Sequence, residues 1–200
     1  MGETVRYMVS PVVIAMWRDS ASDMGYPDKE IGWSDILRAA ENGDLKWSHP
    51  STQSASGLLT TLAEFYVGAG ITRGLTEEMV GDPATTDYVI ALERTVKHYG
   101  EGELAIMQRV EEQGRDFLDA FVVQEQLVVR HNQRHGYQLI AIYPAEGTLW
   151  EDHPLAMLET PDRSDEERMA FQLFEEYLLS EEVQRTILSA GYRPSDLDIS

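Results

Sequence analysis

Residues 51–57 carry the side chains best placed to hold a polar ligand, because they supply hydroxyl groups at the predicted start of a helix. This segment, Ser51-Thr52-Gln53-Ser54-Ala55-Ser56-Gly57, contains four hydroxyl side chains and ends at a glycine that lets a backbone or a ligand come close. The first N–H groups of a helix lack intrahelical partners, and the macrodipole adds about half a positive charge. The segment, called the cradle below, can therefore bind an anion or a polar oxygen, or it can be an ordinary serine-rich helix cap.

The cradle is expected to join a short strand to a long helix. Leu45 to Trp47 can end a strand, and the helical spacing of apolar residues begins at Ser54 and stops at Gly68 and Gly70. The apolar positions that recur at this spacing are Leu58, Leu59, Leu62, Phe65, Tyr66 and Ala69.

Two histidines have the spacing of metal ligands on one face of a helix. His131 and His135 stand four residues apart, but Gly136 follows at once and no carboxylate is well placed beside them in the sequence. We therefore expect solvated helix ends here, and no metal or other cofactor. Glu151-Asp152-His153 is similarly interpreted as a turn before a strand.

The sequence does not indicate an enzyme. His49 and Ser51 lie in one turn, yet the chain contains no G-x-S-x-G elbow for a serine hydrolase and no glycine-rich phosphate-binding motif. Metal-dependent catalysis through the histidines is the weaker alternative, and it calls for metal analysis of the purified protein.

Composition limits the partners and the chemistry. The 200 residues are 42% apolar and carry 35 acidic against 16 basic side chains, giving a formal charge of -19. This charge argues against a nucleic-acid partner, and the absence of cysteine excludes thiol catalysis, disulfides and zinc-thiolate sites. The apolar run Val9–Trp17 is too short for a transmembrane helix, and it lacks the features of a signal peptide.

Strands and helices are expected to alternate along the chain, which predicts an α/β sheet whose ligands gather where strands lead into helices. Val9–Trp17 should be a central strand that starts at Pro11, and Gln124-Glu125-Gln126 should form a second strand-to-helix junction after a strand at 118–123. The other expected strands cover 137–143 and 155–158, and the other expected helices cover 35–41 (capped by Ser34), 76–80, 85–99, 103–112, 127–132, 164–178 and 180–188.

Several phrases, in order along almost the whole chain, resemble type II periplasmic solute-binding proteins. The similarity is to the molybdate-binding-protein-like group, and within it to members fused to a von Willebrand factor A domain. The phrases are 10–17 (SPVVIAMW), 31–35 (IGWSD), 49–57 (HPSTQSASG), 125–126 (EQ), 143–148 (YPAEGT), 153–156 (HPLA) and 174–194, which ends in GYRP.

The resemblance implies two α/β lobes joined by hinge strands, with the solute in the cleft between them. Residues 12–132 would be the second lobe, while 1–11 and 133–200 would be the hinge crossing and the C-terminal part of the first. The chain then resembles a fragment that lacks the N-terminal half of the first lobe. An incomplete lobe exposes an apolar face that can drive homodimerisation.

The same resemblance assigns candidate solute contacts. They are Ser51, Thr52, Ser54 and Ala55 in the cradle, Val123, Gln124 and Glu125 at the second junction, Tyr143 where the chain recrosses, and Ser10 beside the hinge. We expect the cradle to face solvent, with Gln124 and Tyr143 as its neighbours.

Two functions follow as hypotheses. The first is an extracytoplasmic module that holds a small polar or anionic solute for a membrane transporter or a signalling partner. The second is a protein-interaction or structural module that has lost solute binding and selects partners through its negative charge.

Overall fold

The computed structural model describes residues 4–99, 102–196 and 198–199. They form two compact units: a larger unit, Pro11–Trp150, and a smaller unit that contains the described residues up to Ser10 and from Glu151 onward. Residues 133–150 fall in the larger unit, where β4 (Leu139–Ile142) pairs with residues 14–17 of β1 (Thr4–Trp17). The lobe boundary at residue 132 stays a prediction.

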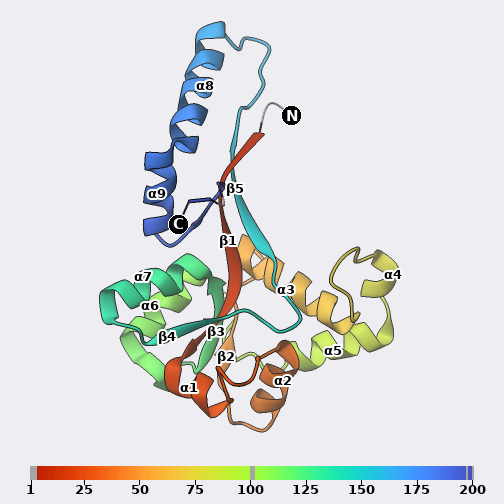
Figure 1. Cartoon of the computed structure of the whole chain (residues 1–200). Helices are drawn as coiled ribbons and strands as arrows, with labels where there is room; N and C mark the ends of the chain where they lie inside the picture. Colours follow the sequence, from red (N-terminus) through yellow and green to blue (C-terminus); the bar gives the residue numbers. More distant parts are fainter. Residues whose placement is uncertain (1–3, 100–101, 197, 200) are drawn as a thin grey trace. The chain divides into compact units, whose positions relative to one another are not determined.

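The larger unit is built on a sheet with the strand order β2-β3-β1-β4 (Figure 1). Strand β2 (Trp47–Ser48) runs parallel to β3 (Ala120–Gln124), and β1 lies antiparallel to β3 and β4. The prediction that β1 is a buried central strand is confirmed. Pro11, however, lies inside β1, between the residues that pair with β6 and those that pair with β3, where its missing N–H is tolerated.

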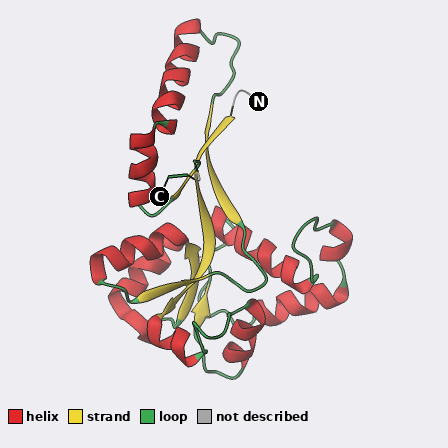
Figure 2. Cartoon of the chain, viewed as in Figure 1, coloured by secondary structure: helices red, strands yellow, loops and turns green. Residues whose placement is uncertain are grey.

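Helices cover both faces of this sheet, as Figures 1 and 2 show. The helices of this unit are α1 (Arg18–Asp23), α2 (Trp33–Glu41), α3 (Ala55–Gly68), α4 (Glu77–Val80), α5 (Pro83–Glu93), α6 (Glu103–Gln113) and α7 (Glu125–His135), with a 3-10 turn at Gly114–Asp116. Alternate residues of β1 enter two different cores. Val12, Ile14 and Met16 pack with α2, α3 and α5, whereas Val13 and Ala15 pack with α6 and α7.

Helix α2 begins one residue before the predicted cap, Ser34. The carboxylate of Asp35 accepts from the Gly32 N–H at 3.2 Å, and that of Glu146 accepts from the Trp33 N–H at 3.1 Å. Gly32 is therefore the cap residue, and its first-turn donors are satisfied by side chains that come after it in the chain.

Helix α5 differs from its prediction at both ends. Asp82 and Pro83, which lie between the two helices predicted at 76–80 and 85–99, are its cap and first residue, and the Asp82 carboxylate accepts from the Ala84 N–H at 2.9 Å. The helix ends at Glu93 instead of Tyr99, because the chain then turns back to β2, where the Lys97 N–H donates to the Trp47 carbonyl at 2.9 Å.

The histidine pair on α7 also differs from expectation. His131 is buried, with 3% of its surface exposed, so it is not a solvated helix end, whereas His135 is exposed.

The smaller unit contains β6 (Arg193–Pro194), all of β5 (Trp150–Ala156) except its first residue, and helices α8 (Asp165–Leu179) and α9 (Glu181–Ser189). The helix predicted from residue 164 is present, and Ser164 and Glu167 form a capping box at its start, exchanging hydrogen bonds at 3.2 and 2.9 Å. No residue of α8 is buried among those described, and large apolar side chains on it are exposed. None of the described helices is both long and apolar enough to span a membrane.

Candidate functional site

The cradle follows β2 and leads into α3, as the sequence predicts, and two of its four hydroxyl side chains, Ser51 and Ser54, accept from backbone N–H groups of this turn. Ser54 is the N-cap of α3: its Oγ accepts from the Gly57 N–H at 3.1 Å and donates to the Ser51 carbonyl at 2.9 Å. The Ser51 Oγ accepts from the Gln53 N–H at 3.3 Å. The capping interpretation is therefore part of the structure, while Thr52 and Ala55 face solvent.

Gly57 fixes the shape of this turn. A Cβ atom at this position would overlap the carbonyl oxygens of Ser51 and Pro50. Glycine therefore lets the backbone of the cradle pack closely against the first turn of α3.

The second junction meets the cradle through Gln124. Its side-chain Nε2 lies 3.5 Å from the Ser56 Oγ and donates to the Glu103 Oε1 at 3.3 Å. The Ser56 hydroxyl also donates to the Glu103 carboxylate, and the Gln126 amide donates to the Gln124 Oε1 at 2.8 Å. The starts of α3, α6 and α7 are joined by these contacts.

Glu103 gives this meeting point a negative charge. Its carboxylate engages the hydroxyl of Ser56 and the amide of Gln124, which are donors that a bound anion would otherwise use. It also belongs to the first turn of α6, where the helix dipole stabilises a negative group. The local chemistry is therefore more favourable to neutral or cationic polar groups than to a free anion.

The remaining predicted contacts have different surroundings. The Tyr143 hydroxyl donates to the carboxylate of Glu125, which is buried, while the tyrosine ring is partly exposed. The Val123 side chain is fully buried in the core beneath α6 and α7, so that only its backbone can reach a ligand. Ser10 is buried and belongs to the smaller unit, whereas all the contacts above lie in the larger one.

The most deeply buried stripe of α3 is polar. Ser56, Thr60 and Glu64 are 2%, 0% and 0% exposed, whereas Leu58 is 51% exposed. The Thr60 hydroxyl donates to the Ser56 carbonyl, one helical turn earlier, at 2.7 Å. The stripe therefore extends along α3 from the cradle to Glu64. The apolar residues whose spacing predicts α3 are therefore not the residues of this helix that are buried most deeply.

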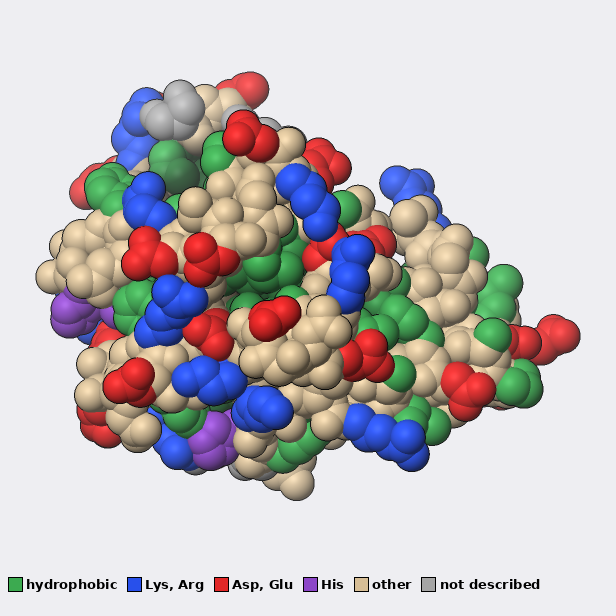
Figure 3. Space-filling model, turned by 90° about the horizontal axis from the view of Figure 1, so that it is seen from below, with side chains coloured by type: hydrophobic (Ala, Val, Ile, Leu, Met, Phe, Trp, Pro, Cys, Tyr) green, Lys and Arg blue, Asp and Glu red, His purple; other side chains and the backbone are tan. Residues whose placement is uncertain are grey.

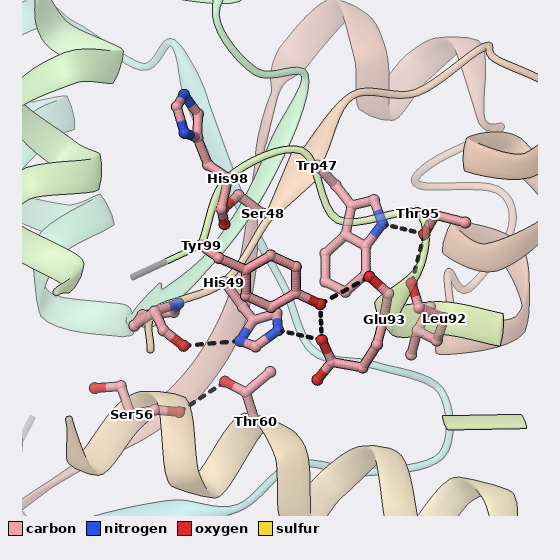
Figure 4. Close-up of polar contacts among 11 residues, drawn as sticks. Trp47, Ser48, His49, Ser56, Thr60, Leu92, Glu93, Thr95, His98 and Tyr99 are labelled. Carbon is pink, nitrogen blue, oxygen red and sulfur yellow. Dashed lines mark hydrogen bonds and ion pairs between the residues drawn. The ribbon is translucent and has the colours of Figure 1, made fainter. Parts of the chain in front are cut away.

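The stripe ends at a buried acid network formed with His49 and α5. His49 Nδ1 donates to the Pro50 carbonyl at 2.8 Å, and its Nε2 lies 3.3 Å from the Glu93 Oε2 (Figure 4). The Tyr99 hydroxyl reaches both the Glu93 carbonyl, at 2.7 Å, and the Glu93 carboxylate. One oxygen of Glu64, one of Glu93 and one ring nitrogen of His49 lie within 4.8 Å of one another.

Burial separates the two acids of this network. Burial, followed by the nearby negative charge of Glu93, raises the pKa of Glu64 to about 9, so this carboxyl keeps its proton at neutral pH. Burial also acts to raise the pKa of Glu93, but hydrogen bonds with His49 and Tyr99 outweigh it and lower that pKa. Burial raises the pKa of Tyr99 as well, and its bond to Glu93 adds to that rise.

Sequence reasoning missed Glu103 and the Glu64 network, and it named Gln126 only as part of the second junction. The spacing of Ser56, Thr60 and Glu64 at every fourth position could have indicated a polar stripe. Glu103 gave no signal, because an acid in the first turn of a helix is common on electrostatic grounds alone.

Solved structures of binding proteins share this fold. The sulfate-binding protein SubI of Mycobacterium tuberculosis H37Rv matches with a TM-score of 0.67 and 21% identity, over 97% of this chain and 59% of that one. The periplasmic binding protein AfuA of Actinobacillus pleuropneumoniae, with fructose-6-phosphate bound, matches with a TM-score of 0.63 and 17% identity, over 98% and 56%. An ABC transporter structure from Clostridium perfringens matches with a TM-score of 0.66 and 16% identity, over 98% and 55%.

These matches define the class: the chain has the α/β fold of type II periplasmic binding proteins, and it spans less than two-thirds of each of these structures. The sequence profile of the bacterial extracellular solute-binding proteins matches residues 1–193, and the chain belongs to this family. Comparison with curated protein sequences finds no significant match.

Proposed function

We propose that the chain is a solute-binding module whose larger unit supplies one wall of the solute site. The observation that carries this proposal is the meeting of Ser56, Gln124 and Glu103 at the starts of three helices. The exposed residues Thr52 and Ala55 lie beside this point in the chain and would complete the wall. Family membership supports an extracytoplasmic location and a non-enzymatic role.

The preferred solute is neutral or cationic and rich in hydrogen-bonding groups. The carboxylate of Glu103 repels an anion at the wall and accepts from hydroxyl or ammonium groups, while the Gln124 amide, which accepts from Gln126 and donates to Glu103, holds that carboxylate in place. The sequence alone predicts a small polar or anionic solute, and the charge of Glu103 makes an anionic solute the less favoured of these. The structural neighbours named for sulfate and fructose-6-phosphate are proteins of the same fold, and their ligands do not transfer to this chain.

A transporter or a signalling protein is the proposed partner of the solute-bound form. The neighbour described as an ABC transporter supports the first of these. The molybdate-like subgroup and the link to a von Willebrand factor A domain belong to the same proposal.

An amide-resolved nuclear magnetic resonance titration tests the solute proposal, because it detects weak binding and locates it. The panel is a neutral sugar, a cationic amino acid, a neutral dipeptide, sulfate and molybdate. We expect saturable shifts at Thr52, Ala55 and Gln124 with at least one neutral or cationic solute. Shifts confined to other surfaces, or an absence of saturable shifts, would contradict the proposal.

The second candidate function is a protein-interaction module, and the exposed apolar face of α8 is the observation that favours it. On the face drawn in Figure 3, which is seen from below, acidic and basic side chains are mixed among neutral and apolar ones, so this face does not present charge of a single sign. If α8 drives self-association, Phe174→Ser will convert a homodimer to a monomer in analytical ultracentrifugation. The exposed-site control Leu104→Ser, on α6, should leave the dimer intact.

A further inference from the structure

We propose a divalent metal site, best suited to zinc, formed by Glu111, His131 and His135. The two histidines follow one another by a helical turn on α7, and Glu111 comes from the neighbouring helix α6. No carboxylate lies close to the two histidines in the sequence, but the fold brings Glu111, 20 residues before His131, beside them. Two imidazoles and one carboxylate form a recognised set of protein ligands for zinc.

The donor atoms are already close to the spacing that a metal ion requires. The Glu111 Oε1 lies 3.5 Å from the His131 Nδ1 and 3.8 Å from the His135 Nε2, and one donor atom from each residue falls within 4.8 Å of the others. Tetrahedral zinc with bonds of roughly 2.0–2.2 Å holds its ligand atoms about 3.4 Å apart. Small side-chain rotations therefore suffice to close the site.

His131 provides a second, independent indication of a ligand. It is 3% exposed, and neither of its ring nitrogens has a hydrogen-bond partner in the described part of the chain. A buried polar atom without a partner is costly, and a metal bond to Nδ1 would remove one of the two unsatisfied atoms. The Trp17 ring packs edge-on against the imidazole with centroids 6.1 Å apart, which limits the orientations of the ring.

The site is open to solvent on its other side. The side chains of Glu111 and His135 are 35% and 45% exposed, so an ion can enter and water can fill the remaining coordination positions. Nitrogen and oxygen ligands without thiolate suit zinc and other late divalent transition metals, whereas magnesium prefers oxygen ligands alone.

A metal at this position would clamp the C-terminal ends of α6 and α7 together. The opposite ends of the same helices carry Glu103 and Gln124, two residues of the candidate solute wall. The inference concerns a site distinct from that wall, and it stands whether or not a solute binds there.

The experiment is a calorimetric titration of the chelator-treated chain with zinc chloride. We expect binding of one zinc ion, at least tenfold weakening in His135→Ala and in Glu111→Gln, and no response to magnesium. Both substitutions affect partly exposed side chains, so the variants should fold, which circular dichroism checks. Glu112→Gln, which removes a neighbouring exposed acid of α6, is the matched control and should bind as the parent does.

Cobalt substitution gives a readout that a merely structural role of these residues would not produce. Co²⁺ bound by His131 and His135 should show visible absorption bands that shift in His131→Gln and disappear in His135→Ala. Absence of saturable zinc binding would overturn the proposal, as would unchanged affinity in both Glu111→Gln and His135→Ala. Loss of the metal only in His49→Ala would also overturn it, because the ion would then belong to the buried Glu64 and Glu93 network.

Discussion

Replacing Glu64 with glutamine should make the stability of the protein less dependent on pH. The carboxyl of Glu64 is fully buried on α3, and its pKa is raised to about 9 by burial and by the charge of Glu93. A glutamine has the shape of the protonated acid and cannot lose a proton to water on unfolding. The variant therefore keeps the neutral state that the fold requires, at every pH.

The sign follows from proton linkage. The native protein holds the Glu64 proton between its ordinary pKa of 4.5 and about 9, whereas the unfolded chain releases it, so wild-type stability falls as pH rises through this range. Each pH unit is equivalent to about 1.4 kcal/mol. Relative to its value below pH 4.5, the contribution of Glu64 should fall by about 3 kcal/mol at pH 7 and by about 6 kcal/mol near pH 9.

Urea denaturation of the wild type and Glu64→Gln at intervals from pH 4.5 to pH 9 measures this difference. The free energy of unfolding of the variant should rise relative to that of the wild type as pH increases, with the steepest change at mid-range. Glu112→Gln, on the exposed face of α6, should show no such trend. A difference between Glu64→Gln and wild type that stays constant with pH would refute the assignment of a protonated Glu64.

Two further perturbations test local parts of the structure. Gly57→Ala should lower the free energy of unfolding by about 1–3 kcal/mol, because the added Cβ would overlap the Ser51 and Pro50 carbonyls. The control Gly102→Ala has open space around the added Cβ and should cost under about 1 kcal/mol. Equal losses for the two variants in thermal or urea unfolding would contradict the role of Gly57. Asp35→Asn should destabilise the protein at neutral pH but not in acid. Burial acts to raise the pKa of Asp35, but hydrogen bonds from Lys29 and Gly32, together with the charge of Arg38, outweigh burial and lower that pKa. The stability that this carboxylate contributes is therefore present above its unfolded pKa and lost as pH falls through its lower folded pKa. In urea unfolding at several pH values, the free energy of unfolding of the wild type should exceed that of Asp35→Asn by less as pH falls. A difference that grows in acid would be inconsistent with this account.

The order of strands and helices could be predicted because each element carries its own pattern. The apolar run Val9–Trp17 predicts a strand buried on both faces, and both faces of β1 are buried in the structure. The capping box at Ser164 likewise depends only on residues within four positions of one another. The ends of α5 were missed because Asp-Pro can break a helix or begin one, and only the return of the chain to β2 determines where this helix stops.

The candidate sites could be predicted only in part, since their members come from distant segments. The cradle and the Gln124 junction carry local signals, whereas Glu103 lies 47 residues after the Ser56 that it contacts, and Glu93 lies 44 residues after His49. The metal cluster shows the same limit: the spacing of His131 and His135 is visible in the sequence, but the packing of α6 on α7 decides that Glu111 joins them. A sequence pattern can propose half of such a site, and the fold supplies the other half.

The most direct test of the central claim is the affinity of Gln124→Ala for the solute that shifts the cradle amides most strongly. Calorimetry should give at least tenfold weaker binding than for the parent chain, because the variant loses the amide that joins the second junction to Ser56. Ser22→Ala, at an exposed position of α1, should bind as the parent does. Equal affinity of Gln124→Ala and the parent chain, or failure of the whole panel to bind either, would contradict the claim that these junctions form a solute-binding wall.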